Sequence, residues 1–192
     1  EDDRAFARTL IEREGLADGY AVFCPFTTRP QKHWFEDRWA RLAGELKCAL
    51  GWRVLMLGGP GDREAGARIL SLAGADFSVD TDSAPTQSLI NLAGTTSLLQ
   101  AAALIEGSRL VIGVDTGLSH MGIAFGRPSL LLFGSTCPYL KTGRDNARVL
   151  YHPRPCSPCK RRPTCQGTFD CMRDLEVAEV LAAAQVLLEG SL

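Results

Sequence analysis

The chain has 192 residues, of which 45% are hydrophobic and 22% are charged, and its formal net charge is -1. These values indicate a soluble globular protein with one sizeable core, too short for two full domains. They argue against a nucleic-acid partner, which favours a basic stripe, and no run approaches the ~20 consecutive apolar residues of a membrane-spanning helix. The opening segment EDDRAFARTLIEREG lacks the apolar stretch of a signal peptide. Because the chain also lacks an initiator Met, we expect it to be a piece of a larger protein.

Helical and strand patterns alternate along the chain. In order, they predict helix 2–14, strand 20–26, helix 34–50, strand 52–59, helix 61–74, strand 89–92, helix 98–106, strand 109–115, helix 117–126, strand 129–134 and helix 174–188. Ser97 and Gln100 have the spacing of a capping box at the start of the helix 98–106. The strands are continuous apolar runs, which is typical of a parallel sheet covered on both faces. The predicted fold class is therefore α/β, with a doubly wound, mainly parallel sheet.

Ligands of such sheets bind beyond the carboxyl ends of the strands, so the loops 27–33, 58–64, 94–97, 115–120 and 134–141 are the candidate sites. In the stretch DTGLSH, a helix begins directly after a strand, and its free N–H groups attract anions. Thr116 and Gly117 could meet a phosphate there, Asp115 could accept hydrogen bonds from sugar hydroxyls, and His120 lies one turn further on. The alternative is a capped turn in which His120 is a core residue.

The loop after the first strand contains two adjacent hydroxyls, Thr27 and Thr28, followed by Lys32. Hydroxyl donors and an ammonium group near a helix start can hold a diphosphate, although a solvated capping loop would have the same residues. After the second strand, Asp62 and Glu64 could accept hydrogen bonds from ribose hydroxyls, or could be ordinary acids of the first helical turn. Patterns such as GxSxG, Walker A or HExxH are absent from the sequence.

Cysteines are numerous, with seven in the chain. Cys24 and Cys48 stand in apolar contexts and are expected to be core thiols. Cys156, Cys159, Cys165 and Cys171 are crowded together, and the first two have metal-ligand spacing, so these four are candidate ligands of a structural zinc or iron ion. Free thiols or adventitious disulfides are the alternatives. Without secretory features, a reducing, cytoplasmic location is expected.

Five segments together resemble one family, glycosyltransferase family 9, the heptosyltransferases of lipopolysaccharide core assembly. They are TTRPQKHWFEDRWARL at 27–42, LGGPGDREAGARI at 57–69, NLAGTTSLLQAAALI at 91–105, VDTGLSHMGIAFGRPSLLLFGSTCP at 114–138 and CSPCKRRPTCQGTFDCMRDLEVAEV at 156–180. The resemblance spans nearly the whole chain in the family's order. It implies the Rossmann-like C-terminal half of a GT-B glycosyltransferase. In that reading residues 1–192 form the nucleotide-sugar domain, with a Cys-rich loop at 152–173 and a last helix at 174–190. The N-terminal acceptor domain is then absent from this chain.

The resemblance also implies roles for individual residues. Lys32, Asp115 and His120 would be the catalytic group, with Asp115 at the transferred sugar. The substrate-binding residues would be Thr27, Thr28, Glu64, Thr96, Leu98, Thr116 and Gly117. Among these, Glu64 would hold the ribose, and the loop from Gly94 to Leu98 would line the adenine.

The activity implied by the resemblance is an inverting transfer of heptose from ADP-heptose to an acceptor glycan, with no cofactor required for catalysis. Lys32 and a helix dipole can stabilise the leaving diphosphate without a metal ion. The general base and the acceptor site would lie in the N-terminal domain, so we expect the fragment alone to be inactive. Contact with the inner membrane would be peripheral at most. The alternatives are a GT-B transferase with another sugar nucleotide or a protein acceptor, and a metal-stapled α/β interaction module without activity.

Overall fold

The fold was determined as a computed structural model, which describes residues 1–75, 87–136 and 142–190. Six strands form one sheet in the order β3-β2-β1-β4-β5-β6, and every neighbouring pair is parallel. The strands are β1 (Tyr20–Cys24), β2 (Arg53–Met56), β3 (Leu89–Asn91), β4 (Leu110–Val114), β5 (Ser129–Phe133) and β6 (Ala147–Tyr151). The predicted doubly wound parallel α/β fold is confirmed.

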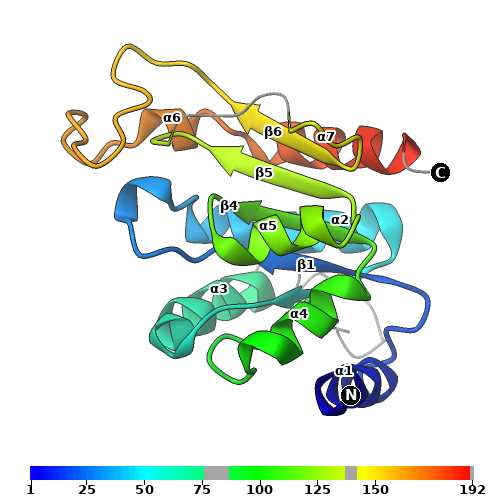
Figure 1. Ribbon diagram of the computed structural model, residues 1–192. Helices are drawn as coiled ribbons and strands as arrows, with labels where there is room; N and C mark the ends of the chain where they lie inside the picture. The colour runs from blue at the N-terminus through cyan, green and yellow to red at the C-terminus, as the bar shows by residue number, and fades with distance from the viewer. Residues whose placement is uncertain (76–86, 137–141, 191–192) are drawn as a thin grey trace.

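Helices cover both faces of the sheet (Figure 1). They are α1 (Asp2–Arg13), α2 (Glu36–Leu50), α3 (Arg63–Ala75), α4 (Leu98–Glu106), α5 (Gly117–Ala124), α6 (Asp170–Arg173) and α7 (Val177–Glu189), with short 3-10 turns η1 (Pro30–Lys32) and η2 (Pro60–Asp62). On one face α2 packs between α3 and α7, and on the other α4 packs between α1 and α5. Within the described ranges, no helix has the length and apolar character needed to cross a membrane.

The core is built from the continuous apolar runs seen in the sequence. All residues of β1, β4 and β5 are buried, as expected for strands with helices on both faces. Trp39 of α2 lies against the ring of Phe23 at a centroid distance of 4.8 Å and against Trp34 at 5.0 Å. The Trp34 indole in turn donates to the Leu175 carbonyl at 2.9 Å, which ties the loop before α2 to the start of α7.

Several element predictions need correction. The sixth strand, β6, was not predicted, because ARVLY mixes exposed Arg148 with buried Val149 and Leu150 and so is not a continuous apolar run. Helix α2 begins at Glu36 instead of residue 34, since the Trp34 side chain is bound to the Leu175 carbonyl in the loop before the helix. The last helix starts at Val177 instead of residue 174, after the separate turn α6.

Two further sequence expectations can be compared with the fold. The capping box is confirmed, because the Gln100 backbone N–H donates to the Ser97 hydroxyl at 3.1 Å and the Gln100 side-chain oxygen accepts from the Ser97 backbone N–H at 2.9 Å. The prediction that Cys48 is a core thiol was wrong. Cys48 lies two positions after buried Leu46 on α2, on the opposite face of that helix, and is exposed, whereas Cys24 is buried as predicted.

Candidate functional site

The candidate loops meet at the carboxyl edge of the sheet. In Figure 1 the strand arrowheads point to the left, towards the blue loop after β1 and the orange segment before α6. From β1 the strands follow one another outward to β2 and β3, and the chain then returns to β4 on the other side of β1 and continues outward to β5 and β6. The strand order therefore reverses between β1 and β4. This reversal is the point at which doubly wound sheets bind their ligands.

Three predicted residues form one hydrogen-bonded group at this reversal. The Lys32 ammonium, which follows β1, lies 2.7 Å from Asp115 Oδ2 and 3.4 Å from the Asp115 carbonyl, at the end of β4. The other carboxylate oxygen, Asp115 Oδ1, is 3.2 Å from His120 Nε2 on α5. The side chains of Lys32 and Asp115 are 17% and 21% exposed, so this ion pair is largely shielded from water. His120 is 43% exposed, which excludes the core-histidine alternative.

The environment of Asp115 keeps its carboxyl group ionised. The hydrogen bond with His120 lowers the pKa of Asp115 most, and the hydrogen bond and charge of Lys32 lower it further, well below its usual range, while partial burial opposes them. Thr136, after β5, acts in the same direction, although its hydroxyl does not complete a hydrogen bond of normal geometry with a described residue. Asp115 is therefore a charged acceptor at neutral pH, and a neighbouring cation offsets its repulsion of anions.

The loop between β1 and α2 holds the other predicted phosphate-binding groups. Thr27 and Thr28 directly follow the buried Pro25 and Phe26, and Thr28 is exposed. His33 Nε2 lies 2.7 Å from the Thr27 carbonyl, so the loop closes on itself between Thr27 and η1. The two threonines and Lys32 thus lie on one short, braced segment beside Asp115.

Helix α5 begins two positions after Asp115, at Gly117. Thr116 is the N-cap residue, yet its side chain makes no capping hydrogen bond, and Gly117 is exposed. The N–H groups at this helix start therefore have no side-chain partner in the cap, as an anion site requires. Buried Ser119 donates to the Val114 carbonyl at 2.8 Å and holds the first turn against β4. A Cβ at Gly113 would lie 2.0 Å from the Ser119 hydroxyl, so only glycine allows this close approach.

Loops after β2 and β3 extend the same edge. Asp62 accepts the Gly59 N–H at 2.7 Å and is committed to its turn, whereas Glu64 is exposed in the first turn of α3. The Arg63 guanidinium donates to the Gly94 carbonyl at 2.6 Å and joins the two loops. Thr96 and Leu98 follow, at the start of α4, where the Leu98 side chain is 62% exposed.

The order of these loops across the sheet is informative. Passing from β3 to β5, one meets Thr96 and Leu98, then Glu64, then the Lys32 loop, then Asp115 and the start of α5, and then Thr136. An apolar surface, a carboxylate, cationic and N–H donors, and hydroxyls therefore succeed one another over strands spaced about 4.8 Å apart. This order of groups along the sheet matches the chemistry of a ligand in which a base, a ribose, a diphosphate and a sugar are joined in a line.

The four clustered cysteines lie in the segment between β6 and α7. Burial raises the pKa of Cys171 to about 11, and the nearby thiols Cys159, Cys156 and Cys165 act in the same direction, which places all four in one neighbourhood. All four are free thiols. As these side chains lie, no group of three or more His, Cys, Asp or Glu residues in the described ranges is arranged to hold a metal ion.

Sequence patterns gave no sign that the Cys-rich segment touches the candidate site. The Lys160 backbone N–H donates to the Ser135 carbonyl at 2.6 Å, and the Lys160 carbonyl accepts from the buried Gln31 side chain at 3.0 Å. Ser157 also donates to the Gly134 carbonyl. The segment therefore connects the loop after β5 with the loop that carries Lys32. These contacts join residues between 23 and 129 positions apart and leave no local sequence signal.

Comparison with known families agrees with this geometry. Residues 1–169 match the family model described as glycosyltransferase family 9 (heptosyltransferase). The chain is 34% identical over 144 residues to lipopolysaccharide heptosyltransferase 1 of Salmonella typhimurium, a match that covers 74% of this chain and 41% of that protein.

Solved structures show the same fold. The ADP-heptose LPS heptosyltransferase II of E. coli superposes with a TM-score of 0.73 at 26% identity, over 98% of this chain and 52% of that one. The E. coli heptosyltransferase WaaC, solved with ADP-2-deoxy-2-fluoro heptose, gives a TM-score of 0.62 at 28% identity, over 88% of this chain and 44% of that one. The chain thus spans about half the length of these relatives or less.

Proposed function

Because the chain belongs to glycosyltransferase family 9, the heptosyltransferase family, we propose that it binds the donor, a nucleotide sugar of the ADP-heptose type, for an inverting transfer in lipopolysaccharide core synthesis. The observation that carries this proposal is the group of Lys32, Asp115 and His120 at the reversal between β1 and β4. Residues 1–192 act as the donor-binding half of a GT-B enzyme. The acceptor glycan and the general base are assigned to the part of the relatives that this chain does not span, so the chain alone turns over little or no substrate.

The donor lies along the carboxyl edge in the order of the loops. The adenine contacts Thr96 and exposed Leu98, and the ribose hydroxyls donate to the exposed carboxylate of Glu64. The solved WaaC contains ADP-2-deoxy-2-fluoro heptose, and the E. coli heptosyltransferase II is an ADP-heptose LPS heptosyltransferase, which supports a donor of this class. The order of the loops along the sheet matches the order of the groups in the nucleotide sugar, which supports an extended conformation of the bound donor.

The diphosphate lies between the loop that carries Lys32 and the start of α5. Thr27, Thr28 and Lys32 offer donors on one side, and the N–H groups at Thr116 and Gly117 offer donors on the other. As the bond between sugar and phosphate breaks, negative charge grows on the leaving phosphate. The Lys32 ammonium and the positive end of α5 stabilise that charge most in the transition state, so they accelerate the reaction without a metal ion.

Asp115 has two tasks in this mechanism. Its carboxylate holds the Lys32 ammonium in place through one oxygen. It also remains ionised and able to accept a hydrogen bond from a hydroxyl of the transferred sugar. His120 fixes the other oxygen at 3.2 Å and so orients the carboxylate. Lys32 keeps donor capacity for the phosphate, because an ammonium group has three N–H bonds.

Isothermal titration calorimetry tests the proposal. ADP is expected to bind, and Lys32→Ala is expected to weaken it at least tenfold, or ~1.4 kcal/mol, while the control Lys47→Ala on α2 leaves it unchanged. Asp115→Asn should weaken ADP-heptose more than ADP, because only the sugar nucleotide meets the carboxylate. Absence of ADP binding at millimolar concentration, or tighter binding of UDP than of ADP, would refute the assignment.

A structural zinc or iron ion on Cys156, Cys159, Cys165 and Cys171 is a separate, finer proposal. Its support is the shared neighbourhood of the four thiols, although their present placement does not form a ligand set. Elemental analysis of protein purified without added metal decides it: about one ion per chain supports the proposal, and four titratable thiols with no bound ion refute it. The free thiols also support a proposed cytoplasmic location, at most peripheral to the inner membrane.

A further inference from the structure

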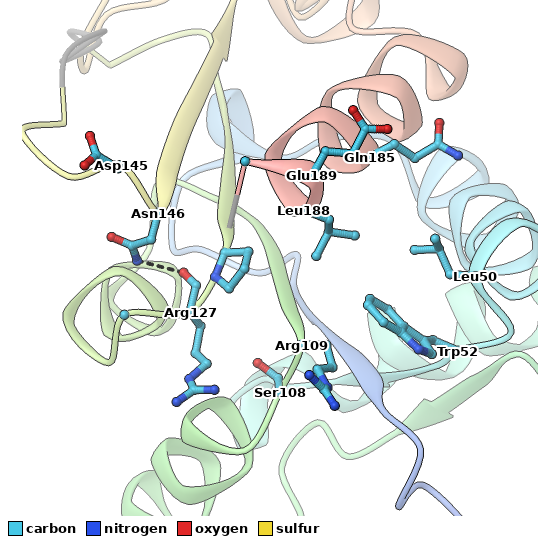
Figure 2. Close-up of a pocket in the computed structure, with 13 residues that line it drawn as sticks. Leu50, Trp52, Ser108, Arg109, Arg127, Asp145, Asn146, Gln185, Leu188 and Glu189 are labelled. Carbon is cyan, nitrogen blue, oxygen red and sulfur yellow. Dashed lines mark hydrogen bonds between the residues drawn. The ribbon is translucent and has the colours of Figure 1, made fainter. Parts of the chain in front are cut away.

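A cavity lies at the end of the sheet where the strands begin, opposite the donor site. It has a volume of about 810 Å³, within the range of small-molecule sites. Its lining comes from residues directly before the strands, such as Trp52 before β2, Arg109 before β4 and Arg127 before β5, and from the ends of α2 and α7. Figure 2 shows these side chains around one open space.

Two arginines in this cavity lack carboxylate partners. Neither Arg109 nor Arg127 makes an ion pair or a side-chain hydrogen bond with a described residue, and Arg127 Nε is buried without a partner. The charge of Arg127 lowers the pKa of Glu106, but both Glu106 oxygens already accept from Arg4, at 2.8 and 2.9 Å. Leaving the buried Nε donor of a charged group unpaired is costly, so Arg127 favours an external anion. Arg109 is an exposed residue of the same cavity, and its guanidinium is accessible to that anion.

The position of Arg127 is fixed by its backbone. Its carbonyl accepts from the Asn146 side chain at 2.8 Å and from the Ser129 hydroxyl at 2.8 Å, and the first of these bonds is drawn in Figure 2. A rigid backbone limits where the guanidinium can reach. Asp145 and Glu189 also line the cavity, but both are exposed, and Figure 2 shows the Glu189 carboxylate directed away from Arg109 and Arg127.

An aromatic surface lies beside one of these cations. Gly19 has a φ of 133°, and a Cβ there would lie 3.0 Å from Arg109 Cγ and 3.0 Å from Trp52 Nε1. The Arg109 stem and the Trp52 indole therefore both lie against the same glycine. Leu50 and Leu188 supply apolar groups nearby. A flat ring next to a cation suits a ligand that combines a flat ring with a negative charge.

We propose that the cavity formed by Trp52, Arg109 and Arg127 binds a small organic anion with a flat ring, an aromatic phosphate or carboxylate. The guanidinium groups bind the charged end, and the Trp52 indole contacts the ring. This site is separate from the Lys32 and Asp115 group, which lies at the other edge of the sheet. The competing explanation is that the two arginines only offset the negative ends of the helices that finish there.

Phenyl phosphate is a suitable probe, with tryptophan fluorescence as the readout. Trp34 and Trp39 are 3% and 1% exposed, so a ligand in solution reaches Trp52 alone among the three tryptophans. We expect saturable quenching, with a Kd weakened at least tenfold in Arg109→Ala and in Arg127→Ala. The control Arg8→Ala, at an exposed arginine of α1, and the donor-site variant Lys32→Ala should leave the Kd unchanged.

Each other outcome counts against the proposal. No saturable change up to ~10 mM phenyl phosphate, where a Kd of ~1 mM would be evident, refutes it. The proposal is also refuted if the quenching is unchanged in Arg109→Lys, in Arg127→Lys and in both alanine variants. Circular dichroism checks that these variants are folded. If inorganic phosphate binds as tightly as phenyl phosphate, the ring is not recognised and the class of ligand is wrong. If saturating ADP abolishes the signal only when Lys32 is intact, the probe has bound at the donor site instead.

Discussion

The Lys32–Asp115 ion pair leads to a quantitative prediction that a double-mutant cycle can test. Lys32→Met removes the ammonium group and keeps most of the side chain, and Asp115→Asn removes the charge of the carboxylate. Two unit charges 2.7 Å apart attract by about 6 kcal/mol at an effective dielectric constant of about 20. Desolvation offsets much of that attraction, because both side chains are about four-fifths buried.

The net energies follow from this balance. Removal of one partner from a buried pair costs about 3 to 5 kcal/mol, and we take the lower end for a pair with a fifth of its surface in water. Lys32→Met is therefore expected to lower the free energy of unfolding by ~3 kcal/mol. The free energy of unfolding of the double variant should be ~2 kcal/mol higher than the sum of the single effects predicts, since neither charge is then left without its partner.

Urea denaturation followed by tryptophan fluorescence and by circular dichroism measures these free energies for the wild type and the three variants. The pair Arg4 and Glu106, which is 2.8 Å apart but more exposed, is the matched control and should show a much smaller coupling energy. Single effects that add to within about 0.5 kcal/mol would mean that Lys32 and Asp115 do not interact in solution. The proposed orientation of Lys32 by Asp115 would then be wrong.

Three further predictions concern the same edge of the sheet. Gly113→Ala forces a methyl group onto the Ser119 hydroxyl and should lower the free energy of unfolding by ~2 kcal/mol and weaken ADP binding; a thermal melt and calorimetry with unchanged values would contradict this close packing. The pKa of Asp115 is lower in the folded chain than in the unfolded one, so its contribution to stability is present above about pH 4 and is lost as the pH falls further. Urea midpoints at pH 7 and pH 3 should therefore differ more in the wild type than in Asp115→Asn, and equal differences would contradict the shift. Ser97→Ala removes the capping box and should cost ~1 kcal/mol in unfolding free energy, whereas an unchanged urea midpoint would show that α4 does not depend on this cap.

Much of the fold could be predicted because its strands are buried on both faces. Continuous apolar runs such as that of β4 are rare outside parallel sheets, and parallel topology puts the end of every strand at one edge. The proximity of the Lys32 and Asp115 loops follows from that rule. β6 escaped prediction for the reverse reason, since an edge strand with exposed Arg148 lacks the signal on which the other strands were recognised.

The details of the site depended on contacts between distant segments. The sequence rules suggested a ligand role for Asp115 but did not indicate that its carboxylate would pair with both Lys32 and His120. The approach of Thr136, and the bridge from Gln31 to Lys160, depend on strand order and on the path of the Cys-rich segment. The arginine cavity was missed because Arg109 and Arg127 each stand alone in the sequence and are brought together only by the sheet.

The parallel pairing of β1 with β4 also has a kinetic consequence. Lys32 and Asp115 are 83 positions apart, and β2, β3 and their helices lie between them in the chain. The conformational entropy of closing so long a loop must be overcome before the central strands pair, so chains of this topology fold slowly. Donor-binding competence is therefore gained late, when the central pair closes, and ADP added during refolding should leave the early phases unchanged and stabilise only the final state.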